Sequence, residues 1–193
     1  MGLQQTHVGS RKRFVVIAVA LGTVVAAGPV TLTQAPASRT TWTDYGGSLD
    51  SAKYSTLTQI TRENVSQLRP AWSYPTYDNT AYHFAPIVVD DVAYVLARNN
   101  SLVALDARSG KEIWIHAELQ GMAPRGINYW ESPDRSDRRL LFQRNSYLEA
   151  IDAKTGKSIL TFGTNGAVNL REGLGRDPAT VTRVQSPNPG KVF

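Results

Sequence analysis

Three polar side chains are the main candidates for binding chemistry, namely His83, Arg125 and Ser186. Arg125 lies directly before a run rich in β-forming residues, and its guanidinium offers a planar fork of donors suited to a carboxylate. His83 lies three residues before Pro86, and Ser186 lies three residues before Pro189. If each proline marks the start of an inner strand, both side chains point into one central channel. The alternatives are a surface arginine paired with a neighbouring acid and two unrelated polar residues beside prolines.

The sequence lacks the usual catalytic patterns. Its histidines are His7, His83 and His116, and no two of them have the spacing of metal ligands. It contains no nucleophile elbow, no phosphate-binding loop and no dinucleotide-binding glycine motif. Asp134 and Asp137 lie in a charged stretch without the Gly and Glu that a calcium loop requires. By residue pattern alone, the chain is therefore poor in catalytic and metal-binding constellations.

A repeat with a period of 46 residues indicates the elements that must position these side chains. The segment 102–114 (LVALDARSGKEIW) returns as 148–160 (LEAIDAKTGKSIL). A short apolar strand, an Asp-x-x-Ser/Thr-Gly turn and another strand at such a period are typical of a propeller blade. Asp106 and Asp152 suit the turns because their carboxylates accept backbone N–H bonds, and the glycine that follows tolerates a left-handed backbone.

The runs of β-forming residues predict two four-stranded blades, at about residues 84–117 and 125–163. The fourth strand of the second blade is expected at residues 158–162. Trp114 is predicted to pack flat against the neighbouring sheet, whereas Leu160 at the equivalent position should pack less well. The expected fold class is all-β, part of an eight-bladed β-propeller with about two complete blades and the edges of others.

The chain before the blades divides into two parts. Residues 1–38 resemble a signal peptide, with a basic cluster at 11–13 followed by apolar and small residues and a small-x-small cleavage option at 35–37. The alternative is an uncleaved membrane anchor, for which this apolar run is marginally long enough. Residues 39–82 form an N-terminal segment in which one short helix is predicted ahead of Val65, with Thr61 and Asn64 as capping residues.

Charge and cysteine content exclude several classes of protein. The net charge is +5, but three of the basic residues belong to the cluster at 11–13, and residues 39–193 carry 18 basic and 16 acidic residues. This balance gives no basic surface for nucleic acid. The sequence has no cysteine, which excludes structural disulfides and attachment of a lipid anchor to cysteine.

The repeat fits the pattern Ala-x-Asp-x-x-Thr-Gly-x-x-x-Trp, at 104–114 with Ser in place of Thr and at 150–160 with Leu in place of Trp. Further motifs are Trp42-x-x-Tyr-Gly-Gly47, Tyr54-Ser-x-Leu57-Thr-Gln-Ile60, Asn64-Val65, Leu68, Ala71-Trp72, Ala85-Pro-Ile-Val-Val-Asp90 and Arg125-Gly-x-x-Tyr-Trp130. Together, these motifs make residues 42–193 resemble the N-terminal part of the pyrroloquinoline-quinone (PQQ)-dependent alcohol and glucose dehydrogenases, the quinoproteins.

The resemblance implies an eight-bladed propeller that holds PQQ and a divalent ion, usually calcium (Ca²⁺), in its channel. It implies oxidation of an alcohol or sugar, with an Asp as general base and the metal polarising the quinone carbonyl. Arg125 matches the family arginine that hydrogen-bonds the cofactor, and Ser186 matches a hydroxyl position that contacts it. His83 stands where methanol-type members carry a cofactor-contacting Glu. Residues 120–124 replace the adjacent cysteines of many alcohol-oxidising members, which favours a sugar-type member.

The resemblance also implies expectations about the whole protein. The family's metal-binding Glu and Asn and its catalytic Asp are expected beyond Phe193, so we expect this chain to be the N-terminal portion of a larger enzyme, inactive and marginally stable alone. It is expected in the periplasm, or membrane-anchored and facing it, and to pass electrons to a quinone or cytochrome c. The competing hypothesis is a non-catalytic propeller that serves as a periplasmic binding or assembly scaffold. Arg125 and the absence of a lipid-attached cysteine favour the dehydrogenase.

Overall fold

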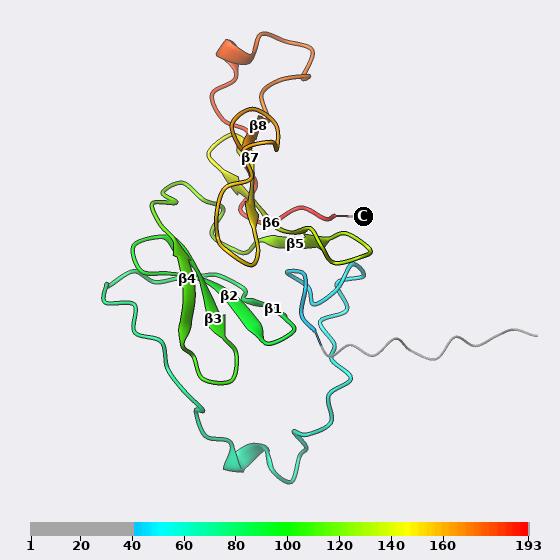
Figure 1. The fold of residues 1–193 in the computed structure, drawn as a ribbon, viewed down its shortest axis with the longest axis vertical. Helices are drawn as coiled ribbons and strands as arrows, with labels where there is room; N and C mark the ends of the chain where they lie inside the picture. Colours follow the sequence, from blue (N-terminus) through cyan, green and yellow to red (C-terminus); the bar gives the residue numbers. More distant parts are fainter. Residues whose placement is uncertain (1–40, 193) are drawn as a thin grey trace, which may run out of the picture. The chain divides into compact units, whose positions relative to one another are not determined.

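The computed structural model describes residues 41–192, which form two four-stranded antiparallel sheets (Figure 1). The first sheet consists, in sequence order, of β1 (Ile87–Val89), β2 (Val92–Ala97), β3 (Ser101–Asp106) and β4 (Glu112–His116). The second consists of β5 (Asn128–Glu131), β6 (Arg138–Arg144), β7 (Tyr147–Asp152) and β8 (Ala167–Asn169). Two four-stranded meanders in succession confirm the predicted β-rich organisation. The predicted signal peptide or anchor at 1–38 lies outside the described residues.

The Asp-x-x-Ser/Thr-Gly turns form by the predicted mechanism. The Asp106 carboxylate accepts hydrogen bonds from the Ser109 N–H at 2.8 Å and from the Ser109 hydroxyl at 2.7 Å. These bonds hold the pKa of Asp106 below its usual range. The Gly110 N–H donates to the Asp106 carbonyl at 2.8 Å, and Gly110 has a φ of +70° that disfavours any residue with a Cβ. Equivalent bonds to Asp152 close the second turn.

Trp114 docks on the turn of the second sheet, as predicted. A Cβ at Gly156 would lie 2.6 Å from the indole Cε3, so only glycine leaves room for the ring. The indole Nε1–H donates to the Ala153 carbonyl at 3.2 Å, and the Tyr94 hydroxyl donates to the same carbonyl at 3.1 Å. Around these contacts, buried side chains from both sheets form one core, which includes Ile87, Leu102, Leu140, Phe142 and Ile151.

Trp72 repeats this arrangement on the opposite face of the first sheet. A Cβ at Gly110 would lie 2.5 Å from the Trp72 Cε3, and the Trp72 Nε1–H donates to the Ala107 carbonyl at 3.0 Å. Trp72 and Tyr74 cover a small cluster of side chains that alternate with those of the main core along the strands: Ala97, Val103 and Leu105. Both faces of the first sheet are therefore packed by residues of this chain.

The second sheet differs from the prediction at its fourth strand. Residues 158–162, expected to be a strand, form an isolated bridge and then a turn, and β8 pairs with β7 instead. Leu160 is 67% exposed and docks on no turn within the described residues, in agreement with its predicted poor packing. Gly163 and Gly166, with φ values of +59° and +89°, then reverse the chain. The sheet consequently ends at Asn169, beyond the predicted limit.

The N-terminal segment is mostly irregular. The predicted short helix is a single 3₁₀ turn, η1 (Val65–Gln67). Asn64 is its N-cap residue, but its side chain does not cap the turn as predicted, because its Oδ1 accepts the Thr61 N–H at 2.7 Å instead. Earlier in the segment, Trp42 forms an antiparallel bridge with Val88 of β1. Among residues 41–192, no helix has the length and apolar character needed to cross a membrane.

Candidate functional site

Two of the three candidate residues, His83 and Arg125, line one pocket beside three chain segments that are joined by backbone hydrogen bonds. The Ala85 N–H donates to the Arg125 carbonyl at 3.1 Å, and the Arg125 N–H donates to the Pro187 carbonyl at 3.3 Å. These bonds frame an open pocket of about 740 Å³. Its lining consists of Tyr45, His83, Phe84, Ala85, Pro124, Arg125 and Pro187. The structure therefore brings His83 and Arg125 together.

Arg125 presents an exposed guanidinium at this pocket. Its Nη1 donates to the Asn188 side-chain oxygen at 3.3 Å. Within the described part of the chain, no carboxylate pairs with Arg125, so the alternative of an ordinary surface ion pair gains no support there. A guanidinium has further N–H groups, and the pocket that Arg125 lines could take a carboxylate-bearing ligand.

Ser186 lies beside the pocket rather than in its lining. Its hydroxyl accepts the Asn188 N–H at 3.1 Å, and its own N–H donates to the Gln143 side-chain oxygen at 3.0 Å. The hydroxyl is therefore already engaged as an acceptor, although it can still donate a hydrogen bond. The role of Ser186 as a cofactor contact stays a prediction.

The spacing argument based on prolines gains only partial support. Pro86 directly precedes β1, whereas no described strand follows Pro189. The equivalence of His83 and Ser186 stays a prediction.

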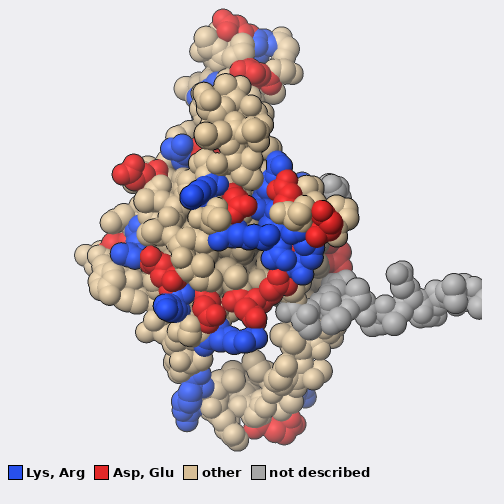
Figure 2. Space-filling view, viewed as in Figure 1, with Lys and Arg blue, Asp and Glu red and all other residues tan. Residues whose placement is uncertain are grey.

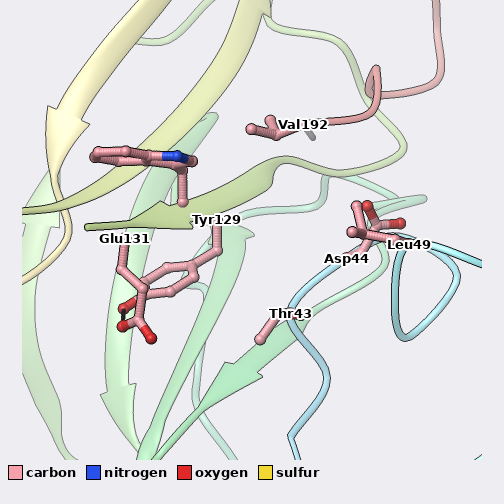
Figure 3. A pocket seen from close by; sticks show the side chains of 7 residues that line it. Thr43, Asp44, Leu49, Tyr129, Glu131 and Val192 are labelled. Carbon is pink, nitrogen blue, oxygen red and sulfur yellow. Dashed lines mark hydrogen bonds between the residues drawn. The ribbon is translucent and has the colours of Figure 1, made fainter. Parts of the chain in front are cut away.

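Sequence reasoning missed Tyr45, which lines the same pocket as Arg125 and His83. It belongs to the motif Trp42-x-x-Tyr-Gly-Gly47, so a signal was present, but nothing in its spacing placed it near Arg125, which lies 80 positions further along the chain. Its neighbours in that turn line a second hollow, of about 310 Å³. Figure 3 shows Thr43 and Asp44 on one side of this hollow and Tyr129 and Glu131 on the other.

A group of charges joins the two sheets near this second hollow. Arg135 reaches Asp90 of the first sheet at 2.7 Å and Glu131 at 3.0 Å, and Arg138 approaches Asp90 at 3.3 Å. Figure 2 shows acidic and basic side chains interspersed over the β5–β6 hairpin. Burial opposes ionisation of Glu131, but hydrogen bonds from Tyr129 and Arg135 lower its pKa nonetheless. Burial, with the bond to Glu131, raises the pKa of Tyr129.

The described residues offer no metal site. Across 41–192, no group of three or more His, Asp or Glu side chains is arranged to hold a metal ion. Asp134, which the sequence placed in a charged loop, has its pKa lowered to about 2 by hydrogen bonds from Ser132 and Ser136. Its partners are hydroxyl and amide donors of its own loop, so the carboxylate has a structural role there.

Comparison with known proteins identifies the fold family. The family described as the glucose/ethanol/alcohol dehydrogenase β-propeller domain, PQQ, matches residues 42–191. This chain belongs to that family. The dehydrogenase propeller assignment accounts for the two successive meanders and for the docking of tryptophans on Asp-x-x-Ser/Thr-Gly turns. It confirms the resemblance to quinoproteins that the motifs indicated.

Relatives in this family act on both alcohols and sugars. The chain is 32% identical to the glycerol dehydrogenase large subunit of Gluconobacter oxydans over 77% of its own length, and 30% identical to the quinoprotein glucose dehydrogenase of Escherichia coli over 72%. The crystal structure of the quinohemoprotein alcohol dehydrogenase from Comamonas testosteroni matches 69% of the chain, with 28% identity and a TM-score of 0.56. The chain spans 23%, 21% and 20% of these proteins, respectively.

The open pocket has the chemistry that the family cofactor requires on one side. PQQ is a planar quinone that carries carboxylates, and the pocket provides a guanidinium from Arg125, an imidazole from His83 and aromatic rings from Tyr45 and Phe84. A guanidinium binds carboxylates through paired N–H groups, and aromatic rings stack on planar ligands. The residues present therefore fit the cofactor at this surface.

Proposed function

We propose that this chain forms part of the PQQ-binding surface of a dehydrogenase that oxidises an alcohol or sugar. The observation that carries the proposal is the guanidinium of Arg125, which faces an open pocket beside His83 without a carboxylate partner in the described residues. Family membership supports a dehydrogenase over a non-catalytic scaffold, because the matching family is that of the dehydrogenases.

In this proposal, the residues of the chain bind and orient the cofactor. Arg125 holds a carboxylate or quinone oxygen through its free N–H groups, while the backbone bonds to Ala85 and Pro187 fix the start of its side chain. His83 supplies a second polar contact from the same pocket, and Ser186 can donate its hydroxyl hydrogen from the rim. When bound, PQQ supplies the capacity to accept two electrons from the substrate. We propose that Ca²⁺ is bound by residues outside 1–193.

The finer points of the proposal rest on family motifs. We propose a glucose-type substrate because residues 120–124 lack the adjacent cysteines expected of many alcohol-oxidising members. We propose export to the periplasm, with or without an N-terminal anchor, and a quinone or cytochrome c as electron acceptor. Because the pocket is open to solvent on this chain, we also propose that residues 1–193 do not turn over substrate by themselves.

Titration of the 193-residue chain with PQQ tests the proposal, with the cofactor's absorbance or fluorescence as readout. The wild-type chain should bind PQQ saturably, and Arg125→Met should weaken binding by about tenfold or more, because a hydrogen bond to a charged group contributes about 1.5–3 kcal/mol. Arg108→Met is the matched control, since Arg108 pairs with Asp91 at 3.0 Å outside the pocket and is 78% exposed. Absence of saturable binding, or equal binding by Arg125→Met, would overturn the proposal.

A further inference from the structure

We infer that Tyr45 is a further cofactor-contacting residue and that the ion pair between Asp44 and Lys191 positions it; this inference rests on the proposed function. Tyr45 lines the pocket together with Arg125 and His83. Its ring lies beside the residue that follows Arg125, because a Cβ at Gly126 would be 3.4 Å from the Tyr45 Cδ2. The ring offers a flat apolar surface to a planar quinone, and the phenol offers an O–H to its oxygen atoms.

The backbone around Tyr45 is fixed by a tight turn tied to the first sheet. Trp42 exchanges two backbone hydrogen bonds with Val88 of β1, at 2.8 and 2.7 Å. The Gly47 N–H donates to the Asp44 carbonyl at 2.9 Å, and the Gly46 N–H donates to the Asp44 carboxylate at 3.1 Å. A Cβ at Gly46 would lie 2.7 Å from Ser51, so the turn requires glycine there. Tyr45 is thus presented from a defined position.

The Asp44–Lys191 pair connects this turn to the third side of the pocket. Asp44 is only 5% exposed, and the Lys191 ammonium donates to its carboxylate and, at 3.3 Å, to the Ser48 carbonyl. Lys191 follows Gly190, whose carbonyl accepts a hydrogen bond from the Asn128 side chain at 2.9 Å. The segment that carries Pro187 and the turn that carries Tyr45 are therefore held together by one pair of opposite charges.

Loss of the lysine charge would disturb the turn for a simple physical reason. A nearly buried carboxylate is costly unless a cation or several donors compensate it. Without the ammonium, the Asp44 carboxylate must move toward water, and this movement alters the turn that presents Tyr45. The pair therefore acts on the cofactor through Tyr45, as a positioning element.

The test is PQQ titration of the 193-residue chain and its variants, with circular dichroism to check folding. Tyr45→Ala should weaken PQQ binding by about tenfold, whereas Tyr54→Ala, which removes a 61% exposed tyrosine from the same N-terminal segment, should leave it unchanged. Lys191→Met should also weaken binding, and Lys191→Arg, which keeps the positive charge, should retain most of it.

A second measurement on the wild-type chain does not depend on the folding of any variant. Tetranitromethane nitrates accessible tyrosines, and mass spectrometry locates the nitrated residues. PQQ should protect Tyr45 from nitration and should not protect Tyr54. If Arg125→Met weakens binding while Tyr45→Ala does not, or if PQQ leaves nitration of Tyr45 unchanged, the inference fails and the proposed function stands. If the wild-type chain does not bind PQQ, the proposed function fails and the inference fails with it.

Discussion

Replacement of Trp114 by alanine should weaken the packing between the two sheets. Truncation of a fully buried Trp costs about 3–5 kcal/mol. Trp114 is partly buried, so the lower limit applies, and the total includes the bond of about 1 kcal/mol from its Nε1–H to the Ala153 carbonyl. We expect the free energy of unfolding to fall by about 3 kcal/mol. That is a large share of the roughly 5–15 kcal/mol typical of a folded domain.

The assay is urea unfolding followed by circular dichroism, which does not depend on the fluorescence of the removed indole. With an m value of about 2 kcal/mol/M, the midpoint should fall by about 1.5 M. Trp114→Phe should cost less because it keeps an aromatic ring in the space over Gly156. Leu160→Ala is the control at the equivalent, exposed position and should change stability by about 0.5 kcal/mol or less. A loss below about 1 kcal/mol for Trp114→Ala would refute the docking argument.

Three further predictions concern the turns and the charges. Gly156→Ala should be clearly more destabilising in thermal unfolding than Gly173→Ala. Both glycines have a positive φ, but of the two only Gly156 has an indole within 3 Å of the new Cβ. Equal effects of the two substitutions would show that backbone strain alone matters. Asp106→Ala should destabilise the chain at pH 7 but lose its effect as pH falls through the acid range. Because the pKa of Asp106 is lowered in the folded state, its contribution to stability is present above the ordinary pKa of about 3.9 and is lost as the carboxyl takes up a proton. An effect that stays equally large as pH falls would contradict this. Asp90→Asn should weaken contact between the sheets slightly at low salt and not at 1 M NaCl, which urea midpoints at two salt concentrations would check.

Local patterns predicted the parts of the fold that depend on neighbouring residues. The four strands of the first sheet and the two Asp-x-x-Ser/Thr-Gly turns follow from alternation, β-propensity and the short reach of an Asp carboxylate. The docking of Trp114 was also predictable, because a large aromatic side chain in an edge strand needs an apolar surface outside its own sheet. The runs of β-forming residues predicted the number of strands in each sheet.

The predictions that failed depend on contacts between distant residues. The prediction of a strand at 158–162 was wrong. There the chain meets β7 only in the bridge between Ser158 and Ile151, and the regular pairing with β7 is made by Ala167–Asn169 instead. Tyr45 was missed because its place beside Gly126 results from folding of the N-terminal turn onto β1.

The sequence by itself determined the family, the two blades and the candidate residues, because repeats, turns and strand patterns are encoded over a few residues at a time. Only the tertiary structure decided that Arg125 and His83 share a pocket, that Trp72 covers the free face of the first sheet, and that Asp44 meets Lys191. These contacts join residues 35 to 147 positions apart. Their free energy depends on burial and on geometry in three dimensions, which linear spacing does not contain.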